Sequence, residues 1–327
     1  KQYVAVDDAI SSTSFVNVGV PQGSILGPLL FLIYINDFHR CLSSGVAQHF
    51  ADDTAIVFND SSLNKMKSSM SCEITKIEDW LCANRLSLNA AKTEILLFRP
   101  KNKSCSVNFN LKIMNKRMLL SKKVKYLGVV LDSRLSWRCH LSELAKKLSR
   151  ANGLLSKIRY FVDAHTIKCL YYSLFHSHMT YGCLTWGVTC KKNLKRISNL
   201  QRRAIRIITF SCYSDPTSNS FSHLEILKLG EEIKFKMCLF MHDWHWMKLP
   251  RSFEKFYAYY SPAVKTRMSE AAKLSLPMIR TDTYGRNNIK YRGATLFNQL
   301  RDINIHLNIP KAIFRKVIKS LLSASYT

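Results

Sequence analysis

The sequence predicts an α+β fold, with short strands and a few helices first and a longer, mainly helical part after them. Up to Asp132, apolar and polar residues alternate in short runs, which is typical of strands. From Trp137 onward Leu and Ile recur at three- and four-residue steps, which is typical of helices. The 327 residues are 47% hydrophobic, with only 11 Gly and 8 Pro, so the chain can bury a large core.

Charge is distributed unevenly along the chain. The formal net charge is +27. Residues 1–100 carry 8 Lys/Arg against 10 Asp/Glu, a balance of −2, whereas residues 101–327 carry 41 against 12, a balance of +29. A near-neutral segment that holds acids, followed by a strongly basic one, predicts a metal site joined to a surface that binds a polyanion.

The ten cysteines and the start of the chain bear on its compartment. The cysteines form no CxxC pair, and no secretory leader opens the sequence, so we expect reduced thiols in a nuclear or cytoplasmic protein that is not secreted. The longest apolar run, Ile25 to Ile35, is broken by Gly27-Pro28 and is too short to span a bilayer, so no membrane partner is expected. Because Lys1 stands first, we expect a piece of a longer protein.

The first stretch predicts strands, a loop and a helix. Residues 1–18 alternate enough for one or two strands, with a turn at Asp7-Asp8. The loop from Gly19 to Ser24 holds two glycines and a proline, so its backbone can approach a ligand closely and Gln22 can touch a base or sugar. An ordinary strand-to-helix turn is the alternative. The run from Ser24 to Cys41 is apolar on nearly every face and predicts a buried helix capped by Ser24.

A hairpin with two acids at its tip is the most informative feature. Two strand-like runs, 46–50 and 54–58, flank Asp52 and Asp53. Neighbouring carboxylates point apart on a regular strand but can approach one point at a turn. Two like charges so close favour a bound cation, and Mg²⁺ is usually held by one or two carboxylates plus substrate phosphates. Taken alone, a solvated acidic turn explains the pair better, because Asp is common in turns.

A helix, a loop and further strands follow the hairpin. Residues 62–82 carry apolar residues at helical spacing, and Asn84 to Thr93 forms a loop that contains Lys92. A loop lysine is usually only solvated, but near a phosphoryl-transfer site it can donate a proton to leaving pyrophosphate. Strands are expected at 94–98, at 107–113 and at 124–131.

The basic part predicts amphipathic helices over residues 140–162, 165–186 and 191–210. Cationic residues lie between their apolar positions. A solvated helix face explains most single arginines, but the excess of positive charge as a whole predicts a surface that binds a polyanion. Residues 211–222 are Ser-rich and predict a linker, and further helices are expected at 224–247 and 310–322. The residues that we expect to contact nucleic acid are Lys146, Arg150, Arg196, Arg202, Arg203 and Arg206.

Five motifs occur in one order. They are Gly19-Val20-Pro21-Gln22-Gly23-Ser24, Tyr34-Ile35-Asn36-Asp37, Phe50-Ala51-Asp52-Asp53, the loop up to Lys92-Thr93, and Tyr126-Leu127-Gly128 with Leu131-Asp132. Together they resemble the reverse transcriptases of non-LTR, LINE-type retrotransposons, and within this group they are similar to Jockey-like elements. The resemblance covers residues 19–132.

The resemblance implies a role for each motif. Pro21, Gln22, Gly23 and Ser24 would contact the template and the incoming nucleotide; Asp52 and Asp53 would be catalytic metal ligands for two Mg²⁺ ions; Lys92 would be a general acid; Tyr126, Leu127 and Gly128 would grip the primer's 3′ end. The implied reaction is in-line attack of a primer 3′-hydroxyl on the α-phosphate of a dNTP, on an RNA template. No specific protein partner is indicated.

The resemblance also implies a domain order and one departure. It predicts a partial polymerase palm over residues 1–135, a helical thumb over 136–212, and a basic, mainly helical C-terminal region over 213–327. The family's first metal-binding aspartate precedes the Gln22 loop by more chain than is present here, and the fingers are absent too. We therefore expect this fragment to have little polymerase activity alone. The alternative is a decayed or co-opted RNA-binding protein without catalysis.

Overall fold

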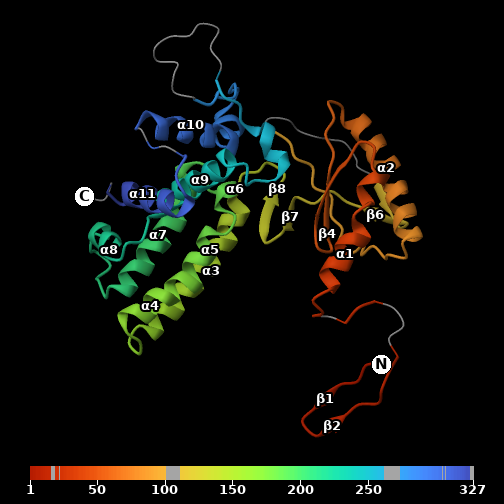
Figure 1. Ribbon diagram of the computed structural model, residues 1–327, viewed down its shortest axis with the longest axis horizontal. Helices are drawn as coiled ribbons and strands as arrows, with labels where there is room; N and C mark the ends of the chain where they lie inside the picture. Colours follow the sequence, from red (N-terminus) through yellow and green to blue (C-terminus); the bar gives the residue numbers. More distant parts are fainter. Residues whose placement is uncertain are drawn as a thin grey trace. The chain divides into compact units, whose positions relative to one another are not determined.

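The computed structural model describes residues 1–15, 19–21, 23–100, 111–260, 273–303, 305 and 307–324. The chain divides into two compact units, Lys1–Lys122 and Lys123–Thr327 (Figure 1). Both contain helices and antiparallel ladders, so the predicted α+β class is confirmed. Each ladder of the described chain has two strands.

The first unit begins with strands β1 (Ala5–Val6) and β2 (Ala9–Ile10), which form a hairpin. Its turn lies at Asp7-Asp8, as predicted. Helix α1 (Gly27–Ile35) and the 3₁₀ helix η1 (Phe38–Cys41) follow. Strands β3 (Val46–Phe50) and β4 (Asp53–Val57) form the predicted acidic hairpin.

Helix α2 (Leu63–Ala83) carries the core of the first unit. Its apolar residues pack with Leu111 and Met118 of strands β5 (Leu111–Ile113) and β6 (Lys116–Met118). The buried Glu73 carboxylate accepts hydrogen bonds from Ser43 N at 2.9 Å and Lys76 Nζ at 3.3 Å, so α2 fixes the segment that leads into β3. The strand expected over 94–98 is reduced to a single bridge at Ile95.

The prediction that residues 24–41 form a buried helix is wrong in its burial. Helix α1 forms, but Leu29, Leu32 and Ile33 are each more than half exposed. A helix that is apolar all round needs neighbours on every side. Ile35 is the one buried residue of α1, and Phe38 of η1 is buried just after it.

The second unit opens with a hairpin and a long helix. Strands β7 (Lys123–Tyr126) and β8 (Val129–Asp132) pair around Leu127-Gly128, so the single strand expected over 124–131 is wrong. Leu127 and Gly128 both have positive φ, which reverses the chain within two residues. The Asp132 carboxylate then accepts hydrogen bonds from the backbone N–H groups of residues 134, 136 and 137, just before helix α3 (Arg138–Ile158).

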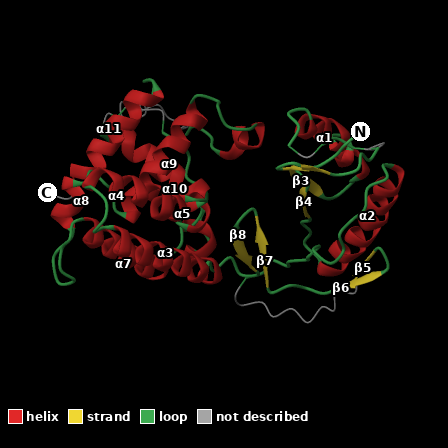
Figure 2. Cartoon of the chain, turned by 90° about the horizontal axis from the view of Figure 1, so that it is seen from below, coloured by secondary structure: helices red, strands yellow, loops and turns green. Residues whose placement is uncertain are grey.

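Helices make up the rest of the second unit (Figure 2). A run of short helices leads to helix α7: α4 (Ala164–Leu170), the π-helix η2 (Tyr171–His176), α5 (Ser177–Thr180) and α6 (Cys183–Trp186). Helix α7 spans Lys191–Ile208, α8 spans Ser218–His223 and α9 spans Leu229–His245. Next come η3 (Arg251–Phe256), η5 (Asp282–Arg286), α10 (Ile289–Asp302) and α11 (Lys311–Ser323).

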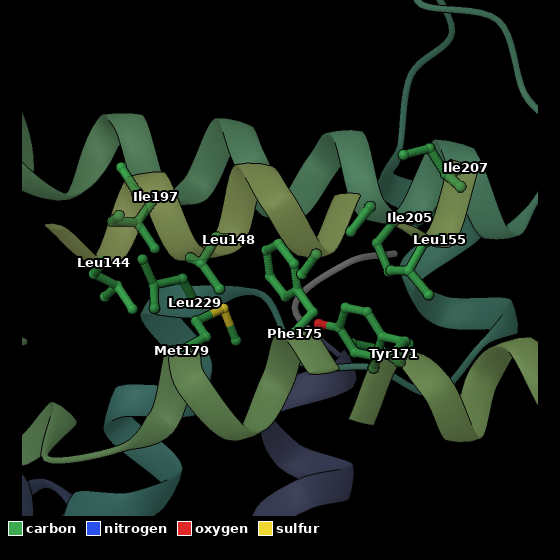
Figure 3. Packing of buried hydrophobic residues seen from close by; sticks show 14 of the residues in the cluster. Leu144, Leu148, Leu155, Tyr171, Phe175, Met179, Ile197, Ile205, Ile207 and Leu229 are labelled. Atoms are coloured by element: carbon green, nitrogen blue, oxygen red, sulfur yellow. The ribbon is translucent and has the colours of Figure 1, made fainter. Parts of the chain in front are cut away.

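Helices α3 and α7 lie side by side and run in the same direction. Asn193 Nδ2 donates to Ser136 O near their starts, and Arg159 Nη1 donates to Ile207 O near their ends. Their seam is closed by fully buried residues such as Leu148 and Ile205 (Figure 3). Apolar residues at three- and four-residue steps on both helices produce this seam, as the sequence predicts.

A second core follows the first one. It joins α9, α10 and α11 around Phe297, Phe314 and Met241. The linker expected over 211–222 is wrong, because α8 forms there and Phe221, 1% exposed, belongs to the α3–α7 core. A single aromatic side chain that reaches a core outweighs a Ser-rich composition. Within the described ranges, no helix is both long and apolar enough to cross a bilayer.

Candidate active site and nucleic-acid interface

The acidic hairpin has the tight turn that two adjacent carboxylates need. Phe50 pairs with Asp53 across the ladder, so Ala51 and Asp52 form a two-residue turn. Asp52 and Asp53 are both exposed, as a site for a solvated ion requires. Ala51 has φ +51°, a left-handed conformation that costs a non-glycine residue roughly 1 kcal/mol. Ten other non-glycine residues of the described chain have a positive φ too, among them Asp7 on the β1–β2 turn, so this conformation shapes the turn and does not by itself mark a site.

Aromatic packing holds this hairpin on its unit. The Phe38 ring meets the His49 and Trp80 rings edge-on, with centroids 5.1 and 5.0 Å away. Across the strands His49 Nδ1 lies 3.0 Å from Thr54 Oγ1. A Cβ on Gly45 would lie 2.8 Å from Ile56 Cγ2, so the start of β3 needs glycine for close approach. The acids therefore project from a base that is fixed against α2.

The other first-unit motifs lie on turns. Ser24 N donates to Pro21 O at 3.1 Å, and Gly23 has φ +87°, the value that a type II turn requires at its third residue. Ser24 Oγ accepts from Gly27 N at 2.9 Å, but the N-cap of α1 is Leu26, so the prediction that Ser24 caps the helix is wrong. Gln22 lies outside the described residues. The exposed Lys92 sits on a turn that Asn89 builds by accepting from the Lys92 backbone N–H.

The Tyr126-Leu127-Gly128 motif forms a turn that is fastened to the helical core. Tyr181 Oη donates to Leu127 O at 2.7 Å. A Cβ on Gly128 would lie 3.3 Å from the Tyr181 ring, so the phenol and a glycine fit together. Trp186, fully buried, donates from Nε1 to Tyr181 O at 2.9 Å. Sequence reasoning missed Tyr181, because a tyrosine followed by glycine carries no signal for a partner more than fifty residues away.

A buried histidine ties the same hairpin to α3. Val130 N donates to His140 Nδ1 at 3.3 Å, so the ring proton of the neutral histidine sits on Nε2. Burial lowers the pKa of His140, because the low-dielectric surroundings disfavour the charged imidazolium. The turn is thus held at two points, through Leu127 and through Val130.

The predicted nucleic-acid-binding residues are mostly solvent-facing. Lys146, Arg150, Arg196, Arg202 and Arg203 are exposed on α3 and α7. Helix α7 contains no acid at all. Arg206 differs from them. It donates from Nε and Nη2 to Asp215 O and lies over the Tyr213 ring, so it also holds the chain that leaves α7.

The predicted residues divide between the two units. Asp52, Asp53, Lys92 and the Pro21–Ser24 turn belong to the first, and the Tyr126–Gly128 turn and the basic helices belong to the second. The structure divides at Lys122, inside the predicted segment 1–135. The boundaries predicted at residues 135 and 212 stay predictions.

Two carboxylates can supply only part of the coordination sphere of a hard divalent cation. Their oxygen ligands fit Mg²⁺, which keeps several waters and takes further ligands from substrate phosphates. No cluster of three or more His, Cys, Asp or Glu that could enclose a metal occurs among the residues that the structure describes. The donor set therefore fits a shared metal site rather than a closed protein cage.

Comparison with known proteins identifies the class of the first segment. Residues 1–131 match the family described as reverse transcriptase (RNA-dependent DNA polymerase). The first 131 of the 327 residues are therefore similar to the reverse transcriptases. They contain the acidic hairpin and all the motifs that lie before Asp132.

The similar curated proteins are polymerases of mobile elements. The chain is 27% identical over 214 residues to the probable RNA-directed DNA polymerase from transposon X-element of Drosophila melanogaster, covering 63% of this chain and 23% of that protein. It is 25% identical over 243 residues to the RNA-directed DNA polymerase from mobile element jockey of Drosophila funebris, covering 71% and 26%. The corresponding protein from transposon BS of Drosophila melanogaster is 27% identical, covering 63% and 24%.

These matches confirm the resemblance to non-LTR retrotransposon reverse transcriptases. The chain spans about a quarter of the length of each of these three relatives. No solved structure gives a significant match.

Proposed function

We propose that this chain supplies part of the palm, the primer grip and the thumb of an RNA-directed DNA polymerase that copies an RNA template from a DNA primer. The observation that carries the proposal is the tight hairpin that presents Asp52 and Asp53 to solvent within a segment similar to the reverse transcriptase family. When bound, Mg²⁺ ions would neutralise the charge that develops on the transferring α-phosphate.

The chain's own residues have separate tasks in this proposal. Asp52 and Asp53 hold the divalent ions, with Asp52 the principal ligand. Lys92, exposed on its turn, donates a proton to the leaving pyrophosphate. The turn that contains Pro21, Gly23 and Ser24, with Gln22, orients the template base and the incoming dNTP.

The second unit would hold the product duplex. The Leu127-Gly128 turn contacts the primer near its 3′ end, and Tyr181 keeps that turn in place. Exposed cations on α3 and α7 contact phosphates along the duplex, which gives affinity without sequence preference. This division explains why the excess positive charge lies after residue 100.

We further propose that residues 1–327 alone extend a primer weakly or not at all. Two carboxylates would leave the metal ions under-coordinated, because phosphoryl transfer needs both ions fixed at once. The test is primer extension with an RNA template, a DNA primer, dNTPs and Mg²⁺. Robust incorporation that is lost in Asp52→Ala would refute this second proposal.

Metal binding tests the role of the acids directly. Mn²⁺ serves as the probe, measured by electron paramagnetic resonance with the full chain, an RNA–DNA hybrid and dNTP. We expect Asp52→Asn with Asp53→Asn to weaken Mn²⁺ binding at least about tenfold. The matched control is Asp7→Asn with Asp8→Asn, an acidic pair on another two-residue turn of the same unit. Equal effects of the two double variants would contradict a specific metal role.

A non-catalytic RNA-binding protein is the second candidate. The basic faces of α3 and α7 favour it, because they do not depend on the acids. It predicts hybrid binding that is unchanged by chelating divalent ions and by Asp52→Asn with Asp53→Asn. The polymerase proposal predicts that Mg²⁺, dNTP and hybrid bind cooperatively.

A further inference from the structure

An exposed aromatic patch lies where α3 and α7 both end. Its rings are Tyr160, Phe161, Phe210 and Tyr213, with exposed fractions of 67%, 87%, 55% and 87%. They come from two short segments, 159–161 and 210–213, which Arg159 joins by donating from Nη1 to Ile207 O. The Tyr160 and Phe210 rings meet edge-on, with centroids 5.7 Å apart.

Arginines lie between these rings. The Arg159 guanidinium is 4.7 Å from the Tyr160 centroid and 4.6 Å from the Phe210 centroid, and its Nη2 donates to Tyr160 Oη at 2.6 Å. The Arg206 guanidinium is 5.5 Å from the Tyr213 centroid. These contacts orient the rings at the surface, because each guanidinium is itself held by a backbone carbonyl.

Phe210 occupies a position that disfavours it. Its φ is +54°, and Ser211 N donates to Arg206 O, so it is the left-handed residue that ends α7 in a Schellman motif. Glycine is usual there, and a bulky residue is strained. Its ring does not join the buried core but stays more than half exposed. Arg85, Glu225 and Met247 hold the same left-handed place after α2, α8 and α9, so this conformation alone gives Phe210 no special role. What distinguishes Phe210 is its exposed ring beside Tyr160 and Arg159.

We infer that this patch binds unpaired nucleobases of a single-stranded nucleic acid. Every base has a π-face, and aromatic rings and guanidinium planes stack on it without regard to sequence. The surrounding charge suits the same ligand: residues 157–163 and 202–215 contain five Lys/Arg against two Asp. One helical turn before Arg206, the exposed Arg202 and Arg203 continue the cationic surface.

The charge favours nucleic acid over a protein partner. Tyr, Phe and Arg are also enriched in protein interfaces, so the rings do not distinguish the two, but five Lys/Arg against two Asp in residues 157–163 and 202–215 suit a polyanion. An unpaired strand that leaves the duplex held by α3 and α7 would meet this patch at the helix ends. The inference rests on the proposed nucleic-acid binding but adds a separate site for bases.

The test compares single-stranded RNA with an RNA–DNA hybrid of equal length. Binding to the full chain is measured by fluorescence anisotropy at one salt concentration, with 2-aminopurine in the single strand to report stacking. The variants are Phe210→Gly alone and Phe161→Ala with Tyr213→Ala. The matched control is Tyr260→Ala, a tyrosine of the same unit that is 62% exposed.

We expect each patch variant to weaken single-strand binding at least about fivefold and to reduce 2-aminopurine quenching. Hybrid binding should change less than about twofold. Phe210→Gly should melt at or above the wild-type temperature, because glycine relieves the left-handed strain, so misfolding cannot explain its loss of binding.

Three results would overturn the inference. The first is a patch variant that binds single-stranded RNA as tightly as the Tyr260→Ala control does. The second is a patch variant that loses affinity for the single strand and for the hybrid equally. The third is a wild-type dimer in sedimentation velocity that Phe161→Ala with Tyr213→Ala dissociates, which would assign the patch to a second copy of the chain. Failure of hybrid binding in the wild type would instead contradict the proposed function, whereas the single-strand comparison still decides the patch.

Discussion

We expect replacement of Gln201 by an apolar residue of similar size to lower the free energy of unfolding of the second unit strongly. Gln201 lies on α7 and is 1% exposed. Its Nε2 donates to Leu227 O at 2.9 Å and to Tyr171 Oη at 3.2 Å, and its Oε1 accepts from Leu229 N at 2.8 Å. One amide thus joins α7, the π-helix η2 and the start of α9.

The magnitude for Gln201→Leu follows from these three bonds. Each buried group left without a partner costs about 1–3 kcal/mol, so three cost roughly 3–9 kcal/mol. The leucine recovers about 1–2 kcal/mol through apolar burial. We expect the free energy of unfolding to fall by at least about 2 kcal/mol. For a unit of this size that lowers the melting temperature by roughly 4–8 °C or more.

Tryptophan fluorescence during thermal and urea unfolding is a suitable assay. Four of the five tryptophans, all except Trp80, belong to the second unit, so the signal reports chiefly on that unit. The matched control is Gln299→Leu, an exposed glutamine on α10. A Gln201→Leu protein that melts within about 1 °C of this control would refute the reasoning, since about 1 kcal/mol corresponds to 2–4 °C.

Three further predictions follow from the second unit. Tyr181→Phe removes the hydrogen bond to Leu127 O, which is worth about 1 kcal/mol. A primer 3′ end should therefore bind about fivefold more weakly, while binding to the interior of a duplex is unchanged. Equal loss of both kinds of binding would contradict a role in gripping the primer. The affinity for an RNA–DNA hybrid should fall less steeply with salt in the variant Arg202→Gln with Arg203→Gln: the magnitude of the slope of log affinity against log salt should decrease by about 2. An unchanged slope would show that neither arginine contacts a phosphate. Burial raises the pKa of Cys183 to about 11 and of Cys238 to about 12, so neither thiol should react with a disulfide reagent at pH 8 without unfolding, and rapid labelling of either would contradict its burial.

The same thiols give a pH dependence with a definite sign. Their folded-state pKa values are raised, so the stabilisation is complete below the ordinary thiol pKa near 9 and is lost as pH rises toward 11 and 12. Unfolding by urea at pH 8, 9 and 10 should therefore show decreasing stability of the second unit. Cys183→Ala should flatten that dependence, and a slope equal to the wild type would count against the assignment.

Much of the local structure could be predicted from residue order. Periodic apolar spacing predicted α2 and α7 to within two residues at each end and α3 to within four, because an amphipathic face needs only local regularity. The acidic hairpin was predicted for a similar reason, since two β-rich runs enclose a short polar tip. The Asp52-Asp53 pair could be chosen as a candidate site because its neighbours form an ordered set of motifs.

Three predictions were wrong where distant contacts decide. Helix α1 is exposed although its composition is that of a buried helix, because burial depends on which elements surround it. Phe221 turns a Ser-rich linker into part of a core, and Leu127-Gly128 breaks one expected strand into a hairpin. In the first case the helix lacks neighbours, and in the other two a long-range contact or a left-handed turn outweighs the average of the segment.

The sequence by itself determined the family resemblance, the acidic tip, the basic second part and the main helices, because motif order, charge and periodicity are properties of the chain. Only the tertiary structure decided that Tyr181 holds the Leu127-Gly128 turn, that Gln201 is a buried tie, and that aromatic rings gather at the ends of α3 and α7. These depend on residues tens of positions apart that meet only when the helices pack, and no local pattern carries that information.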